Sequence, residues 1–91
     1  MIRCKINGRV WSVSHVPQRE LGSGRDGDCD HPPGRHPRIR ISDRLSGRAR
    51  METEIHEVLH ASRPELDESA VQTTAREIAT VLFRLGWRRL G

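Results

Sequence analysis

The stretch that decides the fold is residues 38–61, RIRISDRLSGRARMETEIHEVLHA. Its first five residues, 38–42, alternate polar and apolar side chains, which predicts a β-strand with Ile39 and Ile41 facing the core. Over residues 45–61 the apolar positions return at helical spacing, and a proline three residues later marks the end of that helix. The stretch therefore predicts a strand followed closely by an α-helix.

A β-hairpin is expected over residues 2–16, upstream of this stretch. Its two strand-like segments are separated by Asn7-Gly8, the pair that best suits the positive φ angles of a type I′ turn. Residues 17–37 come next and are rich in Gly, Asp, Pro and Arg, so we expect a long loop there. A structureless loop of this length is uncommon in a small domain and indicates either function or disorder.

A second helix is expected over residues 67–89, downstream of the stretch. Asp67 is a favourable N-cap, and the helix is expected to run to Gly86 or to the terminal Gly91. Because a short connection joins the two helices, they should pack antiparallel. The apolar stripe that would face the first helix is formed by Val71, Ala75, Ile78, Ala79 and Leu82.

Together these elements predict an α+β fold in a single domain, residues 1–91. A three-stranded, mainly antiparallel sheet is expected to pack on the two antiparallel helices. The large aromatic residues are expected to pack in the core rather than to form a recognition surface: Trp11, Phe83 and Trp87.

Composition limits the partners and the compartment. The 91 residues carry a net charge of +4 and a pI near 10.4, which permits weak contact with nucleic acid, although no interleaved aromatic residues support base stacking. Cys4 and Cys29 are too few for a disulfide framework, and the first residues lack the apolar core of a signal peptide. We expect a cytoplasmic protein without a membrane span, because no apolar run is long enough. The oligomeric state is left open.

The residues that carry chemistry are His56-Glu57-Val58-Leu59-His60, which match the pattern HExxH. Residues four apart lie on one face of a helix, so the two imidazoles converge on one point. Neutral imidazole is a favoured zinc ligand, and the intervening carboxylate can take a proton from a zinc-activated water. We therefore expect Zn²⁺ held by His56 and His60, with Glu57 as the general base.

A third protein ligand must come from another part of the chain. The pattern HExxHxxGxxH is absent, because Arg63 and Leu66 occupy the Gly and final His positions. Glu68 lies on the apolar stripe of the second helix, where a carboxylate is costly unless it is paired or bound to metal. We expect Glu68 to be the third ligand; the alternative is that it only complements the helix dipole.

The chain also resembles a known family. His56 to His60, followed by Glu68, Val71 and Ala75, is similar to the HExxH plus ExxAxxxA arrangement of the gluzincin-like ImmA/IrrE peptidases. Over its whole length it resembles small phage-encoded zinc metallopeptidases, which join a hairpin, a loop like Cys29-Asp30-His31-Pro32-Pro33, an Ile-rich strand and HExLHA. The resemblance implies a minimal zincin-like fold, a zinc ion and hydrolysis of a peptide or protein substrate, in the host cytoplasm.

Three further interpretations concern the surroundings of the expected metal. The strand-then-helix order is the one that zincins use, so an extended substrate is expected to pair with strand 38–42. Cys29 is either a partly buried thiol or a group that occupies the open zinc position and holds the site inactive. Since the chain has no Tyr, His15 or His36 is a candidate for hydrogen bonding the developing oxyanion.

An alternative of a different class remains open at this point. The pI and the scattered arginines also fit a basic module that binds nucleic acid or a partner protein, with HExxH as a structural or degenerate zinc site.

Overall fold

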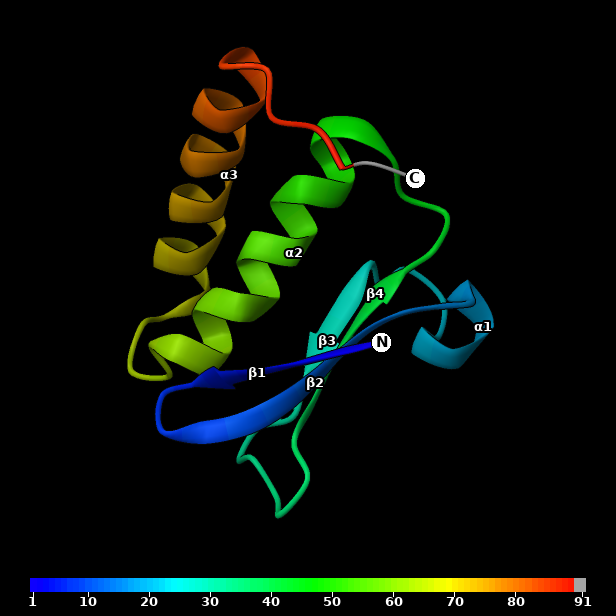
Figure 1. The fold of residues 1–91 in the computed structure, drawn as a ribbon, viewed down its shortest axis with the longest axis vertical. Coiled ribbons are helices and arrows are strands. Elements are labelled where there is room, and N and C mark those ends of the chain that lie inside the picture. Colours follow the sequence, from blue (N-terminus) through cyan, green and yellow to red (C-terminus); the bar gives the residue numbers. More distant parts are fainter. Residues whose placement is uncertain (90–91) are drawn as a thin grey trace.

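The computed structural model describes residues 1–89, which form a mixed sheet and two long helices (Figure 1). The elements in chain order are β1 (Ile2–Ile6), β2 (Arg9–Val16), α1 (Gln18–Leu21), β3 (Gly27–Cys29), β4 (Arg38–Ser42), α2 (Gly47–Ser62) and α3 (Glu68–Arg84). Helix α2 packs on the sheet, and α3 packs antiparallel against α2 (Figure 1). The α+β class is therefore confirmed. Within residues 1–89, no helix has the length and apolar character needed to cross a membrane.

The sheet has four strands in the order β1-β2-β4-β3, where a three-stranded, mainly antiparallel sheet was predicted. Strands β1 and β2 form the expected antiparallel hairpin, and β3 is antiparallel to β4. Strand β4, however, runs parallel to β2. Parallel neighbours need a crossover connection rather than a tight turn, and residues 17–37 provide it. The prediction missed the fourth strand and the parallel pair because it treated this crossover as a loop outside the sheet.

Strand β3 lies inside the predicted loop and changes which strand forms the edge of the sheet. Asp28 faces Arg40 in the register, and the Arg40 Nε donates to Asp28 Oδ1 at 2.9 Å. Strand β4 is therefore enclosed between β2 and β3, so residues 38–42 are not available for pairing with a substrate. The prediction of an edge strand there is corrected: the edge on this side is β3.

The hairpin turn and the core agree with the sequence-based expectation. Asn7 and Gly8 have φ angles of 50° and 78°, as a type I′ turn requires. Ile39 and Ile41 are fully buried, and Trp11 is 2% exposed between the sheet and α2. The core is thus the side of the sheet that faces α2.

Helix α2 covers residues 47–62, close to the predicted 45–61. The N-cap of α3 is Asp67, as predicted, and its Oδ1 accepts from the backbone N–H of Ala70 at 2.7 Å. Gly91, one of the two predicted helix ends, lies outside the described residues.

The end of α3 is set by Gly86, not by residue 89. Gly86 has a φ of 100°, its N–H donates to Phe83 O, and the Trp87 N–H donates to Leu82 O, both at 3.1 Å. These bonds form a Schellman motif, which satisfies the last carbonyl groups and stops the helix. Trp87 then leaves the helix with 64% of its surface exposed, so its predicted place in the core was wrong.

Candidate metal centre

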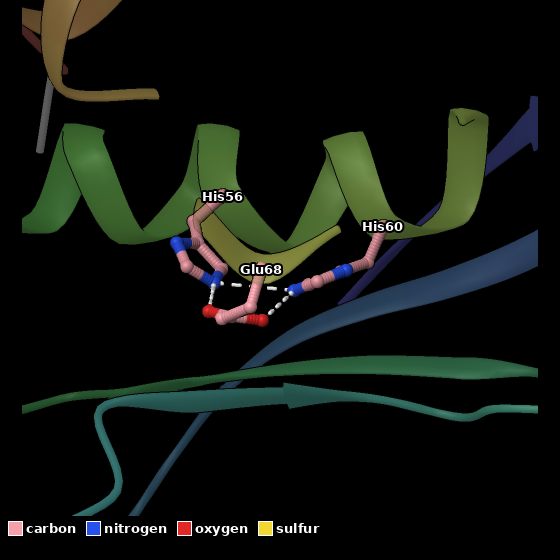
Figure 2. A group of neighbouring side chains, drawn as sticks. All are labelled: His56, His60 and Glu68. Atoms are coloured by element: carbon pink, nitrogen blue, oxygen red, sulfur yellow. Dashed lines mark hydrogen bonds and ion pairs between the residues drawn. The ribbon is translucent and has the colours of Figure 1, made fainter. Parts of the chain in front are cut away.

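Helix α2 presents His56 and His60 on one face, one turn apart, as the spacing predicts. Their Nε2 atoms lie 3.2 Å apart, and both rings point toward the carboxylate of Glu68 (Figure 2). Glu68 Oε1 lies 2.8 Å from the Nε2 of His56, and Oε2 lies 2.9 Å from the Nε2 of His60. The structure therefore brings the three predicted ligands to one point.

Glu68 reaches this point because the chain reverses immediately after α2. The Leu66 N–H donates to Arg63 O at 3.1 Å, and Asp67 then caps α3, so that Glu68 is its first helical residue. Its side chain is 65% exposed, which corrects the expectation of a carboxylate inside the helix interface. Val71 fills that interface instead, fully buried. Glu68 therefore faces the open end of the interface, where it remains accessible to an ion.

The chemistry of these donors and the separation of the two histidines fit a zinc ion. Zinc–imidazole bonds of about 2.0–2.1 Å in a tetrahedral arrangement place two ring nitrogens about 3.3 Å apart. The observed separation of 3.2 Å between the Nε2 atoms of His56 and His60 agrees with that value. The ligand atoms of the two histidines and Glu68 all lie within 4.8 Å of one another. Two imidazoles and one carboxylate leave the fourth position open, as catalytic zinc sites do.

Glu57 projects from the same helix toward β3 and is 7% exposed. Burial, together with the carboxylates of Asp28 and Glu68, raises its pKa from 4.5 to about 7, against the opposing effect of Arg25. A carboxyl group with a pKa near neutral exchanges protons readily at physiological pH. Its burial and its acidic neighbours thus give Glu57 the proton affinity that a general base needs.

Gly27 on β3 is what allows Glu57 to lie so close to the edge of the sheet. A Cβ atom at Gly27 would lie 2.9 Å from the carbonyl oxygen of Arg40, 3.0 Å from Thr53 Cγ2 and 3.1 Å from Glu57 Cγ. All three distances are too short for a normal contact with a carbon atom. Because glycine has no Cβ, α2 can pack closer to β3 than it could against any other residue at position 27.

The outer edge of β3 offers free backbone groups to the same region. The carbonyl of Asp26 accepts from β4 at 2.8 Å, and the N–H of Asp30 donates to β4 at 3.1 Å. Because alternate residues of a strand direct their backbone groups to opposite sides, Gly27 and Cys29 direct theirs away from β4. These are the unpaired donors and acceptors of an edge strand.

A cleft of about 770 Å³ joins the predicted metal ligands, Glu57 and β3. Arg25 and His31 also line it, and neither was assigned a role from the sequence. His15 and His36, the sequence-based candidates for the oxyanion, do not line the cleft. His15 instead contacts Glu54 on α2, with 2.6 Å between its Nε2 and the carboxylate. Arg25 and His31 lie on either side of β3, so their place in the cleft could have been predicted only together with that strand, which the sequence did not reveal.

Cys29 lines the cleft but stays apart from the metal ligands. Among residues 1–89, the close group of possible metal ligands contains His56, His60 and Glu68 only. Burial, with the nearby carboxylates of Glu57, Asp30 and Asp28, raises the pKa of the Cys29 thiol to about 12. The thiol form is therefore strongly favoured in the metal-free chain, where Cys29 is half-buried.

Comparison with known proteins gives no match to a family model, to a curated protein or to a solved structure. The resemblance to small zinc peptidases therefore stays a prediction.

Proposed function

We propose that this protein is a zinc-dependent peptidase with a minimal zincin-like fold, in which His56, His60 and Glu68 hold the metal and Glu57 is the general base. The observation that carries the proposal is the convergence of the two Nε2 atoms and the Glu68 carboxylate on one point, beside a buried carboxyl group with a pKa of about 7. An HExxH pattern on an exposed helix would supply the imidazoles but neither the third ligand nor the buried base.

Zinc bound at this point would supply an acidic water and would polarise the carbonyl group of the scissile bond. Glu57 takes a proton from the attacking water and transfers it to the amine that leaves. Its burial against Gly27 holds the carboxylate in place during both transfers. Glu68 has no proton to move in this scheme; it balances the charge of the metal.

The substrate is proposed to bind as an extended strand along β3, in place of the earlier expectation of residues 38–42. The backbone groups of Gly27 and Cys29 point into the cleft and can pair with a peptide by main-chain hydrogen bonds. Such pairing is independent of side chains, so it places a peptide bond near Glu57 without demanding a particular sequence.

Two cleft residues can stabilise the negative charge that develops on the carbonyl oxygen. Arg25 is a permanent donor and His31 is a donor in either tautomer, and both line the cleft that holds the metal ligands. Asp30 anchors the segment next to His31, because its carboxylate accepts from the Arg38 N–H at 2.9 Å. We assign the oxyanion role to this pair in place of His15 and His36.

The decisive experiment is the metal content of the purified protein by elemental mass spectrometry. Wild type is expected to hold one zinc per chain, and His60→Ala and Glu68→Ala should each lose it. Glu65→Ala is the matched control, because Glu65 is an exposed carboxylate that pairs with Arg63, three residues from Glu68. A salt-bridged trio without metal, in which Glu68 pairs with protonated imidazoles, would give no zinc in wild type even after incubation with excess metal.

Activity is tested separately, on a library of short fluorogenic peptides. Glu57→Gln should keep the zinc and lose hydrolysis by at least about 100-fold, because general-base catalysis contributes 10²–10⁴. Equal zinc content with unchanged hydrolysis in this variant would remove Glu57 from the mechanism. Zinc binding without any hydrolysis in wild type would identify the metal as structural.

A further inference from the structure

The sheet has a second face, which the helices α2 and α3 leave open (Figure 1). Buried side chains show which side faces the helices: Ile39 and Ile41 on β4, and Trp11 on β2. Because side chains alternate along a strand, their neighbours point to the opposite face. The short helix α1 covers the end of this open face, where the Ser42 Oγ donates to Gln18 Oε1 at 2.6 Å.

The uncovered part of this face carries a cluster of cations. The register aligns Arg3 on β1 with Ser12 on β2 and Arg38 on β4, in one row across three strands. The next row contains Lys5, opposite Val10. All three cationic residues are exposed. We call Arg3, Lys5 and Arg38 the basic face.

Two of the three charges of the basic face, those of Arg3 and Lys5, have no acidic partner within the described residues. Among residues 1–89, no ion pair involves Arg3 or Lys5, and Arg38 has only a loose contact of 3.6 Å with Asp30. Residues two apart on a strand are about 6.8 Å apart, and positions two strands apart are about 9.5 Å apart. Arg3 thus lies within the Debye length of about 10 Å at 0.1 M salt from both Lys5 and Arg38, so its potential adds to that of each neighbour.

Acidic residues gather in the cleft and along the edge of the sheet, where Asp28 and Asp30 pair with Arg40 and Arg38. Five acidic residues line the cleft, against one arginine: Asp26, Asp28, Glu52, Glu57 and Glu68, with Arg25. A polyanion is repelled from that cleft and attracted to the basic face. Although the net charge is +4, the cleft is acidic and the basic face is cationic.

We propose that the basic face binds the phosphate backbone of nucleic acid. The face presents three exposed cations and the hydroxyl of Ser12, which suit phosphate groups. It carries no aromatic side chain, so it holds the backbone without reading bases. This binding is independent of the proposed peptidase activity, and it leaves the cleft free.

The test is fluorescence anisotropy with a labelled DNA duplex of about 20 base pairs, titrated at several salt concentrations. Wild type should bind with a slope of log K against log salt of about −2.7, since each phosphate contact contributes about −0.9. Arg3→Gln combined with Lys5→Gln should reduce the slope to about −0.9. If binding in 1 M salt is unchanged, the affinity at about 0.1 M salt falls by about 60-fold.

The matched control is Arg76→Gln combined with Arg84→Gln, which removes the same charge from the exposed surface of α3. It should change the salt slope little, and Arg3→Lys with Lys5→Arg should bind as wild type. An equal loss in both charge-removing pairs would overturn the proposal, because binding would then follow net charge alone. Absence of duplex binding at about 50 mM salt, or binding only to vesicles of anionic phospholipid, would overturn it as well.

Discussion

The close approach of α2 to β3 predicts that Gly27→Ala destabilises the protein. The added methyl group would lie 2.9 Å from the Arg40 carbonyl oxygen, 3.0 Å from Thr53 Cγ2 and 3.1 Å from Glu57 Cγ. The carbonyl is fixed by the pairing of β4 with its neighbours, so the helix has to move. Overpacking of this kind costs about 1–3 kcal/mol, and replacing Gly by Ala restores about 0.4–1 kcal/mol by restricting the unfolded chain.

The net loss for Gly27→Ala is therefore about 1–2 kcal/mol, measured by urea denaturation with the fluorescence of the buried Trp11 as the signal. In a chain of this size it corresponds to a melting temperature lower by roughly 5–15 °C. Gly34→Ala is the matched control, because a Cβ there has no neighbour within 4 Å and its φ is outside the left-handed region. It should be neutral or slightly stabilising. Equal stability of the Gly27 and Gly34 variants would refute the reasoning, since it would mean that α2 does not lie against β3.

The remaining predictions concern the cleft. Because the pKa of Glu57 is about 7 in the folded chain against 4.5 when unperturbed, metal-free protein should lose stability as the pH rises from about 4.5 to 7. Glu57→Gln removes this loss. It should stabilise metal-free protein by about 1–3 kcal/mol at pH 8 and leave its stability unchanged at pH 4, as measured by denaturation in EDTA. Equal gains at both pH values would contradict the raised pKa of Glu57. Burial that raises the pKa of Cys29 to about 12 lowers its thiolate fraction about 1,000-fold. Iodoacetamide at pH 8 should therefore label the exposed Cys4 at least about 100-fold faster than Cys29 in the folded chain, and should label the two cysteines at equal rates in urea. Comparable rates in the folded chain would mean that Cys29 is accessible and ionised. Zinc at about 100 times its dissociation constant should stabilise wild type by about 2.7 kcal/mol and His60→Ala by far less, by thermal denaturation; an equal gain in both would place the metal elsewhere.

Local patterns in the sequence were sufficient for most of the elements. The alternation of Ile39 and Ile41, the Asn7-Gly8 pair and the cap at Asp67 each carry their signal within a few residues. The structure has each of these features at the expected place.

Strand β3 could not be predicted, because nothing local marks it. Gly27 and Asp28 have low strand propensity, and three residues are too few for an alternating pattern. The strand forms because Asp28 meets Arg40 across the sheet and because Gly27 admits α2. Both causes are long-range contacts, so the parallel pairing of β2 with β4 and the correct edge strand were missed with it.

The candidate site shows the same division between local and long-range causes. His56, Glu57 and His60 belong to one helix, so their arrangement follows from helical spacing alone. Glu68 was found by its position on a stripe, but a first-turn residue lies at the end of the interface, so the stripe overstated its burial. The cleft residue His31 depends on the path of the chain after β3, which no periodicity encodes.

The proposed zinc site and the proposed nucleic-acid site lie on different faces of the sheet. Strand β4 contributes Arg38 to the basic face and, through its pairing with β3, holds the edge of the acidic cleft. Asp28 and Glu68 raise the pKa of Glu57, which means that the carboxylates near the cleft repel one another. A divalent cation bound there would reduce this repulsion. Nucleic acid on the basic face adds negative charge that Glu57 and Glu68 do not meet, because the sheet lies between them. The two ligands should therefore bind independently, and an affinity for duplex DNA that is the same with and without zinc is the expected result of that separation.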